Sequence, residues 1–440
     1  MTGGSLSGMA RQAPSAGGLH WLDGLRYGAL GAPLAFAALP LYVLLPSHYS
    51  GQLGVPLAGL GAVLLATRAL DALIDPWLGC WVDKGLAQPR QRLLAWALLA
   101  ALLMALGFAA LFFPPPGAAN ALLAWCAGAL VVTSLGYSAL GVLHQAWGAR
   151  LGGDAAAQAR IVSWREGLSL AGVLAASVLP ALAGIPAMVA TNAALLALGW
   201  WGLSAAPFRP VPPRLLGPAA GDGADPDGST WALPWRVANF RRLMAVFLLN
   251  GVASAIPATL VLFFIRDRLQ APAWEPLFLG SYFAAGALSM PLWVRAVARF
   301  GLLRCWLAGM GLAVAAFVWA ARLGAGDGAA FVAICLASGV ALGADLAIPG
   351  ALLAGVIHRA GHALRHEGSY FGWWTCANKL NLALAAGLAL PALQVLGYAP
   401  GARDEAALVS LALIYAALPC LLKLAAGALL WHHRFHLDRP

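Results

Sequence analysis

The stretch "LLATRALDALIDPWLGCWVDKG", residues 64–85, decides the fold class of this chain. It is apolar enough to lie in a lipid bilayer, and yet it carries Arg68, Asp71 and Asp75. Asp71 and Asp75 are four residues apart, so they share one face of a helix, and Arg68 lies on the same stripe. An ionisable group at mid-bilayer costs at least about 2.5–3.5 kcal/mol, which makes it a candidate functional residue. We therefore expect a membrane-spanning helix with a charged site on one side.

The overall composition extends this interpretation to the whole chain. Of 440 residues, 61% are hydrophobic and only 10% are charged, whereas a soluble domain averages about 25% charged residues. The net charge of +10 does not indicate a nucleic-acid partner, because the basic residues fall in short clusters between apolar runs. The six cysteines are scattered without metal-ligand spacing, and we expect no cofactor. The lipid bilayer is the expected environment.

Apolar runs long enough to span a bilayer divide the chain into two sets. They fall near 24–48, 56–80, 92–113, 118–147, 160–182, 185–205, 240–265, 274–298, 303–322, 329–357, 368–397 and 405–431. This pattern predicts an all-α membrane protein with twelve transmembrane helices. The Pro-, Gly- and Asp-rich break at 208–236 separates two sets of six, a layout typical of two-lobed transporters. The expected parts are a disordered tail (1–22), a six-helix lobe (23–206), a linker (207–238), a second six-helix lobe (239–432) and a short tail (433–440).

The basic residues predict the orientation in the membrane. An even number of spans puts both ends on one side, and the loops of that side contain most of the arginines and lysines. The opposite loops contain only Arg266, Arg268, Arg322 and Arg403. Because loops rich in Lys and Arg stay inside the cell, we expect a multi-pass protein of the inner membrane with both termini in the cytoplasm.

The paired carboxylates predict a binding site for a positive charge. If Asp71 and Asp75 are both ionised in a poorly hydrated site they repel each other, and a bound cation or one shared proton relieves that repulsion. The alternative is that Arg68 neutralises one carboxylate while the other stays protonated. The residues alone leave both readings open.

Further charged and aromatic residues lie inside the apolar runs. Asp345 has no local partner and must pair with another helix, for which Lys379 is the candidate. Arg165 and Glu166 either face the protein interior or extend to the interface from a helix end. Trp147 either stacks on a substrate or belongs to the aromatic belt at the membrane interface. The charged candidates, beyond those of residues 64–85, are Arg165, Glu166, Asp345, Lys379 and Lys423.

At this point "RALDALIDPWLG" (68–79), followed by Asp83-Lys84, resembles the glycoside–pentoside–hexuronide:cation symporters. These relatives of melibiose permease within the major facilitator superfamily carry R-x-x-D-A-x-x-D-P-x-x-G in their second helix. Their opening Tyr-Gly has its counterpart in Tyr27-Gly28. The resemblance implies the major facilitator fold, alternating access and cation-coupled symport. It also implies that Asp71 and Asp75 bind the coupling ion.

The resemblance implies roles for other residues as well. Ser138 matches the fourth-helix hydroxyl that joins the ion site. Arg165 resembles the family's substrate-contacting arginine, and Lys379 its eleventh-helix lysine. Tyr27 and Trp147 join Arg68, Arg165, Asp345 and Lys379 as candidates for substrate binding or gating.

The departures from the family pattern bear on the ion and the substrate. Ile74 stands where the melibiose type has Asn, so a proton is an alternative to sodium. Ala35 and Gly141 stand where sugar-binding members carry Asp. The resemblance implies a sugar or glycoside as the substrate. Sugar hydroxyls must be hydrogen-bonded when they lose water, so the missing carboxylates leave a less polar or amphipathic, lysolipid-like substrate as the alternative.

The predicted function is therefore cation-coupled symport of a small organic solute by a monomer. The basic turn with Asp83, Lys84, Arg90 and Arg92 is expected to latch the lobes when the cytoplasmic side is shut. An uncoupled exporter or a lipid flippase is the alternative. A membrane enzyme is disfavoured, because it would need a nucleophile with a base, or a metal cluster, and the His144/Gln145 and His358–His366 segments lack such spacing.

Overall fold

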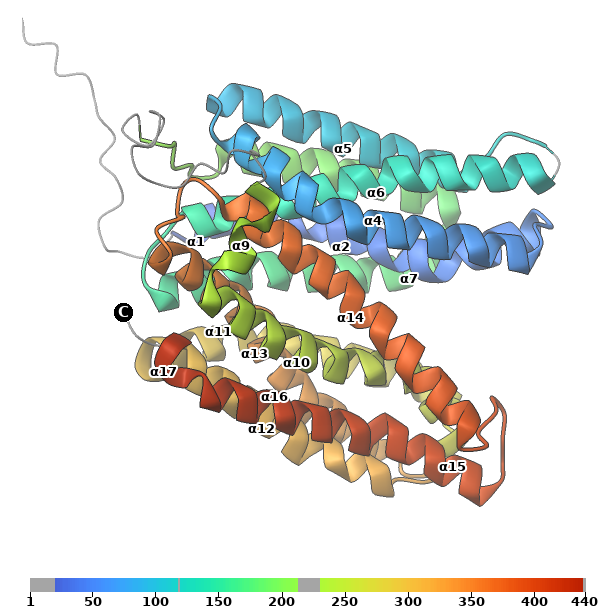
Figure 1. Cartoon of the computed structure of the whole chain (residues 1–440). Coiled ribbons are helices and arrows are strands. Elements are labelled where there is room, and N and C mark those ends of the chain that lie inside the picture. Colours follow the sequence, from blue (N-terminus) through green and yellow to red (C-terminus); the bar gives the residue numbers. More distant parts are fainter. Residues whose placement is uncertain (1–19, 118, 213–229, 438–440) are drawn as a thin grey trace, which may run out of the picture.

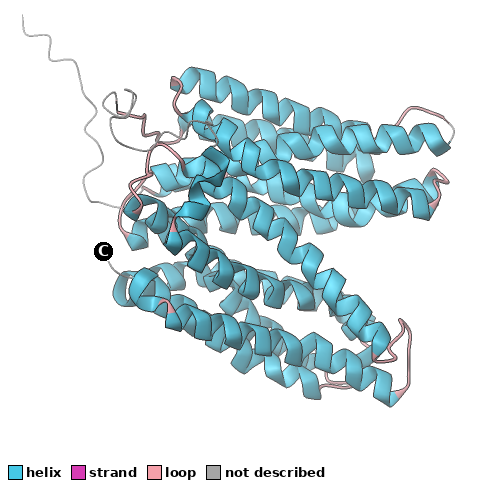
Figure 2. Ribbon diagram, viewed as in Figure 1, coloured by secondary structure: helices cyan, strands magenta, loops and turns pink. Residues whose placement is uncertain are grey.

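The computed structural model describes residues 20–117, 119–212 and 230–437, and these ranges contain helices and loops but no strands (Figure 2). The first span is built from consecutive helical pieces: α1 (Trp21–Gly28), α2 (Gly31–Leu39), η1 (Pro40–Leu44), α3 (Leu45–Ser47) and η2 (His48–Gln52). It is followed by α4 (Leu57–Leu86), α5 (Arg90–Phe112), α6 (Ala119–Arg150) and α7 (Ala155–Ala205). Helix α7 contains two candidate spans, Ala155–Pro180 and Leu182–Ala205, and its backbone departs from helical geometry at Gly184, whose φ of 77° is left-handed.

The second half repeats this plan after a short connection, η3 (Thr230–Ala232) and α9 (Leu233–Arg236). Its first three spans are α10 (Ala238–Phe263) with η4 (Phe264–Arg268), η5 (Pro272–Trp274) with α11 (Glu275–Phe300), and α12 (Leu302–Phe317) with η6 (Val318–Arg322). Its last three are α13 (Gly328–Arg359), α14 (Glu367–Val395), and α15 (Glu405–Ala412) with η7 (Leu413–Ala417) and α16 (Leu418–His432). A final turn, α17 (Arg434–Leu437), follows.

Eleven helical segments among the described residues are long and apolar enough to cross a membrane. Helix α4 is the twelfth long helix, with 30 residues, and its distinguishing feature is the charge that it carries at Arg68, Asp71 and Asp75. It packs against α6 on one side and α14 on the other, so it belongs to the bundle. The prediction of an all-α membrane protein with two sets of six helices is confirmed. Residues 1–19 and 438–440 of the expected tails and 213–229 of the expected linker lie outside the described residues.

The outer surface is apolar, as a lipid-facing surface must be. Large aliphatic side chains such as Leu99, Leu182 and Leu288 are 58–79% exposed on the outer helices. In a soluble protein such exposure would mark an interaction surface, but here it extends over the bundle and matches the hydrocarbon of a bilayer.

The two lobes meet most closely near one end of the molecule. Helices α1 and α17 lie at this end, which we call the terminal end, and the two bundles diverge toward the opposite, far end (Figure 1). The lobes touch through α4 and α14, and through α7 with α11 and α13. Glycines allow the closest approach: a Cβ on Gly372 would lie 2.5 Å from the carbonyl oxygen of Asp75, and a Cβ on Gly79 would clash with the backbone of Gly368.

Candidate functional site

The two carboxylates of α4 hold a lysine from the other lobe. Lys379 Nζ, on α14, lies 2.7 Å from Asp71 Oδ2 and 2.9 Å from each oxygen of Asp75. It also donates to Ser138 Oγ of α6 at 2.7 Å, and the Ser138 hydroxyl donates to Asp71 Oδ1 at 2.8 Å. The side chain of Asp75 is fully buried, whereas those of Asp71 and Lys379 are 15–16% exposed. We call these four residues the carboxylate cluster.

With both carboxylates ionised, the carboxylate cluster carries two negative charges and one positive charge, so it is one positive charge short of neutral. The sequence predicted an opening between the carboxylates for a cation, and in this structure the ammonium of Lys379 lies there. The available ligands for a further cation are carboxylate and hydroxyl oxygens, which suit sodium or a proton. Among the described residues, no group of three or more His, Cys, Asp or Glu is arranged to hold a metal ion.

Arg68 does not take part in this cluster, contrary to the expectation that it lies near the carboxylates. Its side chain is exposed, and its guanidinium lies 4.1 Å from the ring centre of Tyr42 in a cation–π contact. Spacing placed Arg68 on the same stripe as Asp71, but the long side chain extends away along the helix surface. The neutralising charge therefore comes from α14 and not from α4.

A central cavity of about 270 Å³ lies beside the cluster, between the lobes. The Ser138 side chain lines it and so belongs to both features. Arg165 and Glu166 also line it, and they pair with each other through an Arg165–Glu166 Oε1 distance of 2.6 Å. Gln145 of the first lobe donates to Thr375 Oγ1 of the second at 3.2 Å. Other polar lining groups are Tyr137, His144, Ser169, Asp345 and Asn378.

Asp345 pairs with Lys423 and not with Lys379, which corrects the expected partner. Lys423 Nζ on α16 lies 2.7 Å from Asp345 Oδ2, and it donates to Asn250 Oδ1 at 2.9 Å and to Ser254 Oγ at 3.0 Å. The other carboxylate oxygen accepts from Trp306 Nε1 at 2.9 Å and Asn250 Nδ2 at 3.2 Å. This second cluster is neutral, and its ammonium has all three donors satisfied.

Tyr27 and Trp147 lie outside the central cavity, so the structure does not bring these two candidates to a substrate. Tyr27 is fully buried, and its hydroxyl donates to the carbonyl of His144 at 2.9 Å. His144 Nε2 lies 2.7 Å from the carbonyl of Tyr27, so the two residues fix α1 to α6. Trp147 is 1% exposed and donates to the carbonyl of Pro207 at 2.7 Å. Both are packing residues here.

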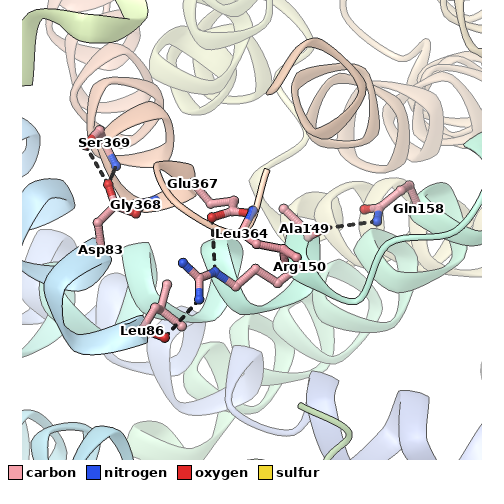
Figure 3. Close-up of polar contacts among 9 residues, drawn as sticks. All are labelled: Asp83, Leu86, Ala149, Arg150, Gln158, Leu364, Glu367, Gly368 and Ser369. Atoms are coloured by element: carbon pink, nitrogen blue, oxygen red, sulfur yellow. Dashed lines mark hydrogen bonds and ion pairs between the residues drawn. The ribbon is translucent and has the colours of Figure 1, made fainter. Parts of the chain in front are cut away.

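At the terminal end, Asp83 joins the lobes by binding the first turn of α14 (Figure 3). Its Oδ1 accepts from Gly368 N at 2.6 Å, and its Oδ2 accepts from Ser369 N at 2.8 Å and from Ser369 Oγ at 2.6 Å. The unpaired N–H groups and the positive end of a helix dipole favour a carboxylate at this position. Asp83 thus makes the lobe-to-lobe contact that the predicted latch required.

The other three predicted latch residues do not bridge the lobes. Arg90 donates to the carbonyls of Ser204 and Ala206 within the first lobe. Arg92 reaches only Gln88, and Lys84 is exposed with no hydrogen bond or ion pair among the described residues. Lys84 and Arg92 lie on the surface of the turn, where water solvates them, whereas Arg90 is partly buried against the end of α7.

A second contact between the lobes, which was not predicted from the sequence, is an ion pair between Arg150 and Glu367 (Figure 3). Arg150 Nε lies 3.0 Å from Glu367 Oε2, with both side chains at most 2% exposed, and Arg150 also donates to the carbonyl of Leu86 at 2.9 Å. Glu367 accepts in addition from the backbone N–H of Leu364. We call Asp83, Arg150, Glu367 and Ser369 the gate. Arg150 could have been noticed in the sequence only as one of many basic residues at a helix end.

The comparisons with known proteins agree with this architecture. Residues 24–439 match the family model described as MFS/sugar transport protein. The similar solved structures include a bacterial homologue of the iron transporter ferroportin in an outward-facing state, at 17% identity and a TM-score of 0.65, covering 93% of this chain and 100% of that one. They also include the E. coli fucose:proton symporter FucP, at 15% identity and a TM-score of 0.61, covering 92% and 97%. No curated protein sequence matches.

These structures share the major facilitator fold and are transporters, not enzymes. The family model spans nearly the whole chain, and both lobes and the inter-lobe cavity fall within it. The chain therefore belongs to the MFS/sugar transport protein family of the major facilitator superfamily.

Proposed function

We propose that this transporter couples the entry of a cation, sodium or a proton, to the symport of a small organic solute. The observation that carries the proposal is the carboxylate cluster: Asp71 and Asp75 of one lobe share the ammonium of Lys379 from the other. The cluster still has a net charge of −1 in a largely buried setting, so it attracts one further positive charge.

The coupling follows from the position of this ion pair across the two lobes. A cation that binds at Asp71 and Asp75 competes with Lys379 for the same oxygens and weakens the link between α4 and α14. Alternating access requires such a link to change, because the lobes must move apart at one end and together at the other. A ligand shifts this equilibrium only by its differential affinity for the two states.

Ser138 connects the cation to the solute. Its hydroxyl bonds Asp71 and Lys379 and also lines the central cavity. The solute would bind there against Arg165, Gln145 and Asn378, within one chain, so a monomer suffices. By family resemblance the solute is a sugar or glycoside, whereas the apolar first span and the absence of Asp at Ala35 and Gly141 favour a less polar one.

The expected orientation makes this state outward-open. The terminal end carries the gate and most of the basic loops, which puts it in the cytoplasm of a cell with the protein in the inner membrane. The gate contacts of Asp83 and Arg150 close that end, while the lobes diverge at the far end (Figure 1). A cation and solute would then enter from outside and leave after the gate opens.

The test is a comparison of three proteins in lipid nanodiscs. We expect the melting temperature of the wild type to rise with sodium at constant ionic strength, or with falling pH, because a ligand of the folded state stabilises it. Asp75→Asn should lose this dependence, and Asp345→Asn, which changes a carboxylate of the neutral cluster, should keep it.

The same proteins then go into proteoliposomes with a panel of labelled sugars, glycosides and amphiphiles. Cation-driven uptake that Asp75→Asn abolishes supports symport. Uptake that persists in Asp75→Asn without any dependence on sodium or pH would instead favour the uncoupled exporter or flippase.

A further inference from the structure

The short helical segment that leads into the second lobe lies across the contact between the lobes. Its first part, η3 (Thr230–Ala232), contacts α4 of the first lobe, and its second part, α9 (Leu233–Arg236), contacts α14 of the second. In Figure 1, α9 lies beside the first turns of α14, at the terminal end. We call residues 230–236 the strap. The strap therefore lies on the two helices that must separate when the terminal end opens.

The strap is fixed to the second lobe. Trp373 Nε1 of α14 donates to the carbonyl of Trp231 at 2.7 Å, and the ring centres of these two residues are 6.0 Å apart. The Trp235 ring packs edge-on against Trp373 at 5.1 Å and against Phe240 of α10 at 5.4 Å. One residue, Val237, separates α9 from α10. The strap must therefore move with the second lobe.

One ring of the strap also contacts the first lobe. The ring centre of Trp231 lies 6.4 Å from that of Trp77 on α4, with an angle of 44° between the rings, which is within the range of attractive aromatic pairs. Trp77 is two residues from Asp75 and two from Gly79, where α4 and α14 approach most closely. Because Trp231 stays on α14, movement of the lobes apart at the terminal end separates it from Trp77.

We propose that Trp231 is a positioning residue that keeps the gate closed by holding Trp77, and with it α4, beside α14. It adds a link made of aromatic rings to the polar contacts of Asp83 and Arg150. The inference goes beyond the proposed function, because this link acts in the closed state whichever ion and solute are carried. The backbone bond to Trp373 does not depend on the Trp231 side chain, so a substitution there leaves this anchor of the strap in place.

The experiment is a double-mutant cycle on Trp77 and Trp231 that measures the ratio of open to closed gate. Spin labels on cysteines placed at the exposed positions Gln91 and His358, in the full chain without its native cysteines, report the inter-lobe distance in nanodiscs. We expect Trp77→Ala and Trp231→Ala each to raise the open-to-closed ratio about two- to tenfold, the equivalent of one aromatic pair. The double variant should exceed neither, because both substitutions remove the same contact.

Two further variants separate the contact from a general loss of packing. Trp231→Phe keeps an aromatic ring and should recover most of the closed population. Trp81→Ala is the matched control, since Trp81 is also on α4, is 67% exposed and has no ring contact among the described residues. It should leave the ratio unchanged.

Wild-type distances in both alanine variants would overturn the proposal, as would effects of the two substitutions that simply add. An opening in Trp81→Ala as large as in Trp77→Ala would also overturn it. If Trp231→Ala does not fold, Trp77→Ala and Trp231→Phe still test the contact, because each removes or reduces only one ring of the pair. The proposed function fails separately, through loss of the sodium or pH dependence of the melting temperature.

Discussion

Lys379 and Asp75 form an ion pair between the two lobes, with the lysine ammonium 2.9 Å from both oxygens of a fully buried carboxylate. The residues come from α14 and α4, which also carry the glycine contacts at the terminal end. Such a buried pair contributes little net stability, because desolvation offsets the attraction, but loss of one partner is costly. Its position makes it suited to sensing a competing cation.

We expect Lys379→Met to strengthen cation binding. Without the ammonium, Asp71 and Asp75 face each other with no counter-charge, so the coupling ion no longer has a competitor. The apparent affinity for sodium or for protons should rise at least about tenfold, about 1.4 kcal/mol, as read from the cation concentration or pH at half-maximal thermal stabilisation. Lys84→Met removes an exposed lysine from α4, the helix of Asp71 and Asp75, and should change nothing. An unchanged midpoint in Lys379→Met would show that this lysine does not compete with the ion.

Asp83→Asn should open the gate. The amide cannot accept from the two backbone N–H groups and the Ser369 hydroxyl together, so the closed state loses about 1–3 kcal/mol. That corresponds to a 5–150-fold shift of the population. Spin labels on cysteines placed at Gln91 and His358, in a chain without the native cysteines, should report a longer inter-lobe distance. Asp154→Asn, which changes a helix cap within the first lobe, is the control and should keep the wild-type distribution.

Gly79→Ala should also favour the open gate, although alanine favours helix formation over glycine by about 1 kcal/mol. A Cβ at Gly79 would clash with the backbone of Gly368 across the lobe contact, and such overpacking costs about 1–3 kcal/mol. Gly61→Ala, in the same helix but with open space where its Cβ would lie, should be neutral or stabilising. The spin-label distances report the opening caused by the clash between the lobes. The melting temperature reports the change in stability caused by the higher helix propensity of alanine. A Gly79→Ala protein that stays closed would mean that the helices adjust without separating.

The fold could be predicted because its determinants are local. Apolar runs of about 20 residues report spanning helices directly, and the charged stretch around Asp71 and Asp75 marks the site. The number of spanning helices could be settled only with the structure, since α4 is identified as one of them by its packing as much as by its composition. The break in α7 falls at Gly184, where the left-handed φ explains why two predicted runs lie so close in sequence.

The partners of the charges could not be predicted in the same way, because they are made by contacts between distant segments. Lys379 is 304 residues from Asp75, and Lys423 is 78 residues from Asp345. Each lysine was a candidate, but helix periodicity fixes only which face a residue occupies on its own helix. Arg68 shows that spacing does not determine which residue a side chain contacts. It lies on the same helix stripe as Asp71, and yet its guanidinium packs on the ring of Tyr42.

The ion pair of Arg150 and Glu367 should respond differently to single and double substitution. Arg150→Met leaves Glu367 buried without a counter-charge, which costs the closed state about 3–5 kcal/mol, and the gate should open. Arg150→Met combined with Glu367→Leu replaces the pair with apolar groups of similar length and should restore much of the closed population. The measurement is the spin-label distance distribution of four proteins: Arg150→Met, Glu367→Leu, the double variant and the wild type. If the double variant is as open as Arg150→Met, the opening does not come from the unpaired charge of Glu367. The attraction between Arg150 and Glu367 would then itself hold the gate shut.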